Sequence, residues 1–284
     1  MTAANRPSCT LCLIAKNEGR YLLEWVAYHR LLGFDQIVIY DNDSDDDTAA
    51  LLAPLQQHGL LERRLWSLGA NESPQTTAYA DALARSQTDW MLFIDADEFL
   101  VLQQHDSVAD FLAPHHADSG IGVVALNWRL FGDNGLTGHD PRPVTERFQM
   151  AAALDFPVQH HVKCFVRVAQ VQKPVRIHLW HSQGRAVHPS GRALETTELQ
   201  GQSRAIEFSV AQLNHYYGKT LEEYQHKAAR GRGGAGQNRP EVKYHYAEHK
   251  FRAHNQNRLP DTSIQRMSAL LQRELARLRT LTAS

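Results

Sequence analysis

The chain has 284 residues, of which 43% are hydrophobic and 21% are charged. This composition is typical of one large α/β domain or two small domains, and it excludes collagen, coiled-coil and disordered chains. Its 30 Lys and Arg residues balance 31 Asp and Glu residues, so no overall positive charge draws the protein to nucleic acid or to an anionic membrane, and we predict no nucleic-acid partner.

The low cysteine content favours a reducing compartment, and the lack of long apolar stretches favours a soluble protein. Cys9, Cys12 and Cys164 are too few to cross-link a chain of this length. Cys9 and Cys12 have CxxC spacing, but no second pair completes a zinc site, so we interpret them as structural, with redox chemistry as the alternative. No signal-peptide pattern is seen, and no run approaches the roughly 20 apolar residues of a membrane span. We therefore expect a soluble, cytoplasmic protein without a transmembrane segment.

Short apolar runs alternate with helical periodicity in the first part of the chain. We predict strands over Cys9–Ala15, Gln36–Tyr40, Leu61–Trp66 and Trp90–Ile94, and helices over Leu22–Gly33, Thr48–His58 and Pro74–Ser86. A strand, a helix and a second strand within about 30 residues form a βαβ unit, and such units build parallel sheets.

The pattern becomes less regular towards the C-terminus. We predict a helix over Val108–His115, a strand over Ile121–Phe131, short strands over Val162–Val168 and Val175–Leu179, a helix from Thr220 to about Ala229, and an amphipathic helix with Ile264, Met267, Leu271, Leu275 and Leu278 on one face. Thr220 and Glu223 have the spacing of a capping box. The glycine-rich segment Arg230–Arg239 is predicted to be a flexible basic loop.

Two acidic clusters follow predicted strands, where the ligands of open parallel sheets bind. Asp95 and Asp97 come directly after Trp90–Ile94. Two carboxylates at positions i and i+2 of an extended segment point the same way and can bind one divalent cation, which in turn can bridge nucleotide phosphates. The alternative is a solvated acidic turn.

The other cluster, Asp41 to Asp47, follows the strand Gln36–Tyr40. Ser44 or Asp45 is expected to cap the next helix. Capping does not explain five aspartates, so Asp41 is a candidate for contacting the base or ribose of a nucleotide. Asp43, Asp46 and Asp47 could serve solubility alone.

Histidines and basic residues supply further candidates. His178 and His215 could complete a metal site, because imidazole is a suitable ligand for Mn2+ beside carboxylates, although each could equally be structural. Lys227 and Arg230, with Arg232 and Arg239, flank or lie in the glycine-rich loop. A mobile basic loop can close over a diphosphate and stabilise a leaving group, and a plain solvated linker is the alternative.

Six ordered segments resemble a known family. They are LCLIAKNEGRYLLEWVAYHRLLGFDQIVIYDNDSDDDT, WMLFIDADEFL, WRLFGDNG, VKCFVR, IHLWH and NHYYGKTLEEYQHKAARG. Together they resemble glycosyltransferases of family 92 and their family 2-like bacterial relatives, from Leu11 to about Gly231. The resemblance implies an α/β fold of GT-A type, with a mixed, largely parallel sheet flanked by helices, an irregular acceptor lobe and C-terminal helices. It also implies transfer from a nucleotide-sugar donor (a UDP- or GDP-sugar) to a glycan or lipid-linked glycan, with inversion at the anomeric carbon.

The same resemblance assigns roles to single residues. Asp95 and Asp97 match the DxD motif that binds Mn2+ or Mg2+. The residues expected to line the nucleotide pocket are Ala15, Glu18, Asp41, Gln75 and Tyr79. Asp133 and Asn134 depart from the small polar residues usual in the family, so acceptor choice does not transfer. Residues 1–135 would form the nucleotide-sugar-binding half, and residues 136–284 the acceptor-binding part of one continuous catalytic domain.

An inverting transfer needs a base that deprotonates the acceptor hydroxyl. The contenders are Glu222, Glu223 and Glu146, with Glu222 ranked first because the capping box gives Glu223 another role. Two other function classes stay open. One is a non-catalytic nucleotide-binding protein. The other is a phosphatase with Asp95 as nucleophile, which Glu98 and Phe99 disfavour because that class needs Thr or Val there.

Overall fold

The computed structural model describes residues 6–67, 73–199, 201–229 and 248–283, without the side chains of residues 172–176. Its first elements are β1 (Cys9–Ala15), α1 (Gly19–Leu31), β2 (Gln36–Asp41), α2 (Thr48–Gln57), β3 (Glu62–Leu65), α3 (Pro74–Arg85), β4 (Trp90–Phe93), β5 (Glu98–Leu102), α4 (Val108–Ala117) and β6 (Ile121–Leu130). These follow the predicted alternation closely. Runs of buried apolar residues define the central strands, and a positive-φ glycine, Gly33, follows the end of α1.

The later elements are shorter. They are α5 (Val144–Arg147), β7 (Met150–Ala151), β8 (Val162–Arg167), β9 (Val171–Arg176), β10 (Leu179–Ser182), β11 (Arg185–Val187), β12 (Ala211–His215), α6 (Leu221–Ala229), β13 (Leu259–Pro260), α8 (Ser268–Thr282) and 3-10 turns over Pro157–His160, Val168–Gln170 and Ser263–Met267. The predicted strand Val175–Leu179 is wrong. That apolar run spans the turn of an antiparallel hairpin, in which Leu179 on β10 pairs with Arg176 on β9.

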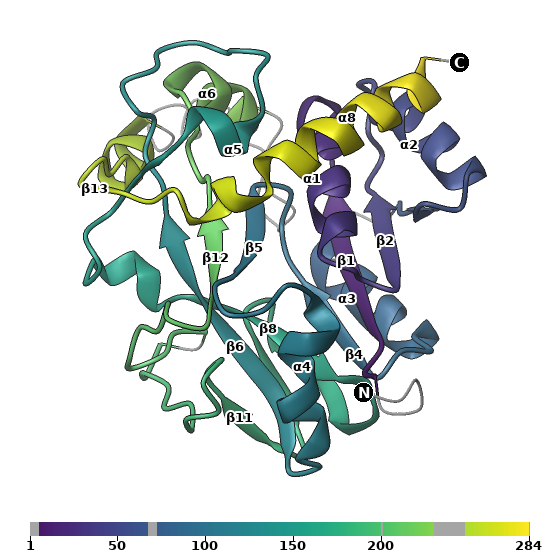
Figure 1. Cartoon of the computed structure of the whole chain (residues 1–284), viewed down its shortest axis with the longest axis vertical. Helices are drawn as coiled ribbons and strands as arrows, with labels where there is room; N and C mark the ends of the chain where they lie inside the picture. The colour runs from purple at the N-terminus through teal and green to yellow at the C-terminus, as the bar shows by residue number, and fades with distance from the viewer. Residues whose placement is uncertain (1–5, 68–72, 200, 230–247, 284) are drawn as a thin grey trace.

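Nine strands of the described chain form one sheet in the order β3-β2-β1-β4-β8-β6-β12-β5, with β11 beside β6 (Figure 1). Strands β1, β2, β3 and β4 run parallel, as do β6, β11 and β12. By contrast, β8 is antiparallel to both β4 and β6, and β5 is antiparallel to β12. The predicted α/β class with a mixed, largely parallel sheet flanked by helices is therefore confirmed.

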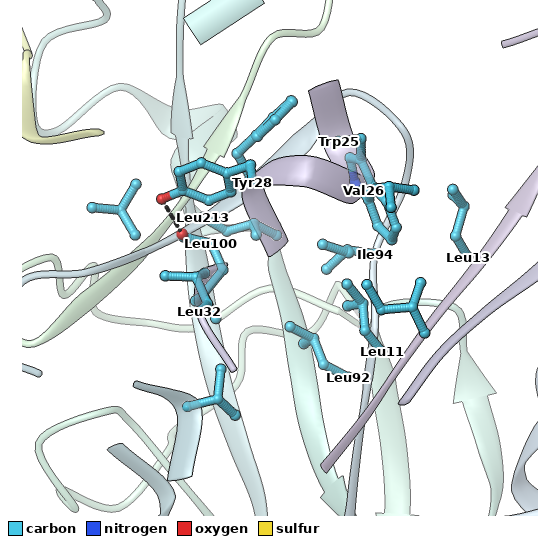
Figure 2. Packing of buried hydrophobic residues seen from close by; sticks show 14 of the residues in the cluster. Leu11, Leu13, Trp25, Val26, Tyr28, Leu32, Leu92, Ile94, Leu100 and Leu213 are labelled. Atoms are coloured by element: carbon cyan, nitrogen blue, oxygen red, sulfur yellow. Dashed lines mark hydrogen bonds between the residues drawn. The ribbon is translucent and has the colours of Figure 1, made fainter. Parts of the chain in front are cut away.

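Alternation along the strands sends side chains to two cores. In β1, Leu11 and Leu13 pack with α1, α2, α4 and α8 on one face, whereas Cys12 packs with α3 and β10 on the other. Figure 2 shows the first core, where the Tyr28 hydroxyl on α1 donates a hydrogen bond to the carbonyl oxygen of Leu100 on β5 (2.7 Å). Helix α8 lies across α1 and α2 (Figure 1). Helices α1, α2, α4 and α8 therefore share one core on the same face of the sheet.

Two other expectations can be compared with the fold. Cys9, Cys12 and Cys164 are buried and form no disulfide, and burial raises the pKa of each thiol; this agrees with a structural role. Within the described ranges, no helix combines the length and apolar character that crossing a membrane requires.

Candidate active site

A tight turn at the carboxyl end of β4 carries Asp95 and Asp97. The Glu98 N–H donates to the Asp95 carbonyl oxygen (3.0 Å), and the Asp95 N–H donates to the Glu98 carboxylate (2.8 Å). The indole N–H of Trp25, on α1, donates to the carbonyl oxygens of Asp95 (3.2 Å) and Glu98 (3.0 Å). Glu98 and α1 therefore fix the turn from the core side.

Asp95 is bound by side chains from two other elements. Lys163 Nζ on β8 lies 2.8 Å from one carboxylate oxygen, and Gln75 Nε2 on α3 lies 2.9 Å from the other. Burial raises the pKa of Asp95, but the Lys163 ammonium outweighs this and lowers the pKa. Gln75 also donates to the hydroxyl of Tyr79 (3.0 Å), whose ring is buried against Phe93. The predicted residue Gln75 thus contacts Asp95 directly, whereas Tyr79 contacts Gln75 and has its ring in the core.

Asp97 is bound by residues from the C-terminal part of the chain. Lys227 on α6 forms an ion pair with its carboxylate, and His215 Nε2 at the end of β12 lies 3.6 Å from the same oxygen. The Tyr216 N–H donates to the Asp97 carbonyl oxygen (2.9 Å). Burial opposes ionisation of Asp97, yet Lys227 and His215 hold its pKa well below the usual value. The structure thus brings predicted residues His215 and Lys227 to the DxD turn.

Three histidines surround the indole of Trp128, which extends from β6. Its ring centroid lies 4.9 Å from that of His161, 5.3 Å from His178 and 4.2 Å from His215. The Trp128 N–H donates to Glu98 Oε1 (2.6 Å), so the indole is tied to the DxD turn. Burial lowers the pKa of each of the three imidazoles, to about 3 for His178, so His178 is neutral at pH 7.

The side chains around the turn include atom types that bind divalent cations. Asp95 and Asp97 offer carboxylate oxygens, and a neutral imidazole is a ligand for Mn2+. His178 Nδ1 lies 3.1 Å from the Val162 carbonyl oxygen, so the proton on Nδ1 leaves Nε2 as an acceptor. The Nδ1 atom of His215 is buried without a hydrogen-bond partner. In the described residues, however, no three His, Cys, Asp or Glu side chains are grouped closely enough to hold a metal ion.

Asp41 lies at the end of β2, where it pairs in register with Ala15 of β1. Its carboxylate accepts two hydrogen bonds from Arg63 (2.9 and 2.6 Å) and one from the Ser44 N–H (3.2 Å), and the residue is 1% exposed. Asp41 therefore anchors Arg63 beside the carboxyl ends of β1 and β2. Ala15 and Glu18 are also buried at this edge.

The capping prediction for the second acidic cluster is wrong. Ser44 Oγ accepts a hydrogen bond from the Asn17 N–H (3.0 Å), and Asp45 accepts one from the Asn17 side chain (2.6 Å). Asp46 instead accepts hydrogen bonds from the first backbone N–H of α2 (2.9 Å) and the first of α1 (3.1 Å). Although burial raises the pKa of Asp46, these bonds and that of Thr48 lower it. The cluster therefore joins two helix N-termini, and Asp46 does more than aid solubility.

Both carboxylate oxygens of Glu223 already accept hydrogen bonds from neighbouring residues. Its buried carboxylate accepts two hydrogen bonds from Arg147 (3.0 and 2.9 Å), one from the Tyr21 hydroxyl (3.0 Å) and two from Thr220. Burial raises its pKa, but Arg147 outweighs this and lowers the pKa to about 2. The predicted capping box is confirmed, because the Glu223 N–H donates to Thr220 Oγ1 (3.2 Å). The geometry therefore argues against Glu223 as the base.

The other two contenders lie in different surroundings. Glu222 is exposed, and its carboxylate accepts a hydrogen bond from the His139 N–H (3.0 Å) in the loop before α5. Glu146 lies on α5 and accepts a hydrogen bond from Gln272 of α8. The structure thus connects Glu222 with the loop after β6, and Glu146 with the C-terminal helix.

Lys163, Glu98 and Trp128 form contacts of the DxD turn that the sequence did not predict. The signal for Lys163 was present, because a lysine in the apolar strand VKCFVR must be buried with a carboxylate or face solvent. The predicted nucleotide-binding residue Arg230, and the loop Arg230–Arg239, lie outside the described residues.

Curated proteins of other organisms are similar to parts of this chain. A glycosyltransferase family 92 protein of Oryza sativa subsp. japonica is 30% identical over 139 residues, covering 49% of this chain and 24% of the relative. One of Ricinus communis is 33% identical over 130 residues, covering 44% and 23%. The chain thus matches about a quarter of the length of these curated relatives.

Solved structures show similarity to parts of this chain. A mannosyltransferase from Pyrobaculum calidifontis in complex with GDP-Man and Mn2+ matches with a TM-score of 0.34 and 20% identity, over 44% of this chain and 36% of that one. Glucosyl-3-phosphoglycerate synthase from Mycobacterium tuberculosis, with Mn2+, UDP and glucosyl-3-phosphoglycerate, matches with a TM-score of 0.36 and 18% identity, over 58% of each chain.

The family model for glycosyltransferase family 92 matches residues 9–275, from the start of β1 into α8. This range includes the acidic turn, the histidines around Trp128 and the lysines that bind the two aspartates. The resemblance seen in the six sequence segments is confirmed, and the chain belongs to glycosyltransferase family 92.

Proposed function

We propose that this chain transfers a hexose from a UDP- or GDP-sugar to a hydroxyl group of a glycan or lipid-linked glycan, with Mn2+ or Mg2+ bound and with inversion at the anomeric carbon. The observation that carries the proposal is the convergence of Asp95, Asp97, Gln75, His215 and Lys227 on one turn at the carboxyl end of β4. These residues come from distant segments. The family membership adds independent support.

The described residues divide the work of such a reaction. Asp95 and Asp97, with His215 or His178, would hold the cation, which supplies charge that neutralises the donor diphosphate. Lys227 would then leave Asp97 and donate to the phosphate oxygens of the departing nucleotide. Its ion pair with Asp97 holds the ammonium close to that position.

Nucleotide binding is proposed at the carboxyl ends of β1 and β2. Ala15, Glu18 and Asp41 lie at this edge. Arg230, which lies outside the described residues, is proposed to contact the donor diphosphate. In this proposal residues 1–135 form the nucleotide-sugar-binding half, and residues 136–284 form the acceptor part of the same catalytic domain. Two strands of the second part, β8 and β12, lie inside the central sheet, which favours one continuous domain.

Glu222 remains our candidate for the base. It is exposed, and its carboxylate is held by one backbone N–H of the loop that follows β6, so one of its oxygens is available for an acceptor hydroxyl. In-line attack then needs that hydroxyl within about 3 Å of the carboxylate. The proton moves to Glu222 as the bond to the departing nucleotide breaks.

The test is a donor panel with purified chain. UDP- and GDP-sugars are incubated with Mn2+, Mg2+ or EDTA, and mass spectrometry follows sugar-nucleotide consumption and product formation. We expect one nucleotide series to be consumed only with the cation, and proton NMR to show an inverted anomeric configuration in the product. Binding without consumption would support the non-catalytic nucleotide-binding alternative. Release of inorganic phosphate with a phosphorylated Asp95 would support the phosphatase alternative.

A further inference from the structure

Lys219 lies in the bend between β12 and α6, directly before the capping residue Thr220. It is 5% exposed, and its backbone has a φ of +53°. In the described part of the chain, its ammonium forms no hydrogen bond or ion pair, and its close contact is with the ring of Tyr21 on α1, 4.2 Å from the centroid. A side chain that is almost entirely buried, charged and without a polar partner needs an explanation.

The other buried cations of the described chain show what is usual. Arg129 pairs with Asp261, Arg147 with Glu223 and Lys163 with Asp95, each at 2.8 to 2.9 Å. Among the buried lysines and arginines that the structure describes, Lys219 is the exception. Removing an ammonium from water without a partner is unfavourable, and buried charges are normally paired. Lys219 therefore lacks the ion pair that stabilises the other three buried cations.

The neighbouring carboxylates do not compensate fully. Asp97, Glu18 and Glu223 act on Lys219 electrostatically, but none forms an ion pair with it. The Glu223 carboxylate already accepts hydrogen bonds from Arg147 and Thr220. Burial lowers the pKa of Lys219, opposed first by Asp97.

The backbone around Lys219 is fixed rather than adaptable. Thr220 is fully buried and forms the capping box that starts α6. At Gly218, an added Cβ would lie 2.9 Å from the Phe251 ring, so this position needs glycine. A left-handed backbone at a lysine costs free energy and persists only where its surroundings determine it. The bend therefore fixes the backbone from which the Lys219 side chain extends over the Tyr21 ring.

We propose that Lys219 is a ligand of the donor diphosphate, which supplies the missing anionic partner. The inference rests on the proposed function, because that function places a nucleoside diphosphate at the DxD turn. Lys219 and Lys227 both act on Asp97, so two ammonium groups from the start and the end of α6 face the same acidic turn. Phosphate oxygens accept charge-assisted hydrogen bonds from ammonium groups. A diphosphate carries one more phosphate group than a monophosphate and so offers anionic oxygens to both lysines.

The test compares nucleoside diphosphates with monophosphates. Dissociation constants for UDP, UMP, GDP and GMP are measured by calorimetry with Mn2+, using the full chain and its variants Lys219→Met and Arg273→Met. Arg273 is an exposed cation on α8 and controls for loss of one charge. For the diphosphate that the unaltered chain binds, we expect Lys219→Met to raise the dissociation constant about tenfold or more. The dissociation constant of the corresponding monophosphate should change by less than about twofold. Arg273→Met should leave both dissociation constants unchanged.

Stability provides the second readout. If Lys219 is retained for a ligand, Lys219→Met without ligand should melt at the same or a higher temperature, because an unpaired buried charge is removed. A lower melting temperature for both Lys219→Met and Lys219→Gln, including failure to fold, would refute the inference and make Lys219 structural. Equal weakening of UDP and UMP, or of GDP and GMP, would also refute it. If the unaltered chain binds neither diphosphate, the proposed function itself fails. If the unaltered chain binds a diphosphate and Lys219→Met binds it equally well, only the inference on Lys219 fails.

Discussion

Replacement of Glu223 by Gln should destabilise the protein strongly while sparing the chemistry. The carboxylate is buried with Arg147, whose side chain is 1% exposed. The pKa of Glu223 falls from 4.5 to about 2 on folding, and at about 1.36 kcal/mol per pKa unit this corresponds to about 3 kcal/mol of stability at pH 7. Breaking a buried ion pair from one side costs a similar amount, about 3–5 kcal/mol.

The pH dependence follows from the direction of the shift. Because the pKa of Glu223 is lower in the folded state, its contribution is complete above about pH 4.5 and is lost as the pH falls through about 2. Urea unfolding of the two proteins should therefore differ by about 3 kcal/mol at pH 7, and by progressively less below pH 4.5. The melting temperature at pH 7 should fall by about 6–12 °C.

Two controls separate this explanation from others. Glu222→Gln, on the same helix but exposed, should change stability by less than about 0.5 kcal/mol. Arg147→Met combined with Glu223→Gln should cost less than the two single changes together, because the partners are coupled. A loss below 1 kcal/mol at pH 7, or a loss that does not vary with pH, would refute the reasoning. Folded Glu223→Gln should keep kcat within about tenfold, and a fall of a hundredfold or more would make Glu223 a base after all.

Three other substitutions test the proposed site. Asp97→Asn should abolish transfer and Mn2+-dependent nucleotide binding, and it should lower the melting temperature because the carboxylate that Lys227 and His215 hold ionised is lost; activity that survives in the folded variant would contradict a metal role. Asp41→Ala should raise the KM for the donor and lower stability by about 1–3 kcal/mol, since Arg63 loses its partner, and an unchanged KM would leave Asp41 a structural anchor. Glu222→Gln should lower kcat by about 10²–10⁴ without raising the donor KM, and unchanged kcat would exclude it as the base.

Local patterns predicted the elements better than their contacts. The run CTLCLIA gave β1 its observed bounds, and Thr220 with Glu223 predicted the cap of α6, because both depend on neighbouring residues. The hairpin of β9 and β10 was missed because its turn lies inside an apolar run. The Lys163 contact with Asp95 joins residues 68 apart in sequence. Spacing in one sequence does not determine which strands become neighbours, so this contact could not be predicted.

The position of β8 between β4 and β6 affects how the chain folds. Strand β4 ends near residue 93 and β6 near residue 130. The strand that joins them, β8, consists of residues 162–167 and therefore follows both in the sequence. A pairing this distant in sequence pays its loop-closure entropy before its contacts form, and such topologies fold slowly. Until β8 pairs, the edges of β4 and β6 that it later covers can pair with strands of other chains. During synthesis, the acidic turn therefore precedes its buried lysine, and the candidate active site is complete only after β8 has paired with β4 and β6.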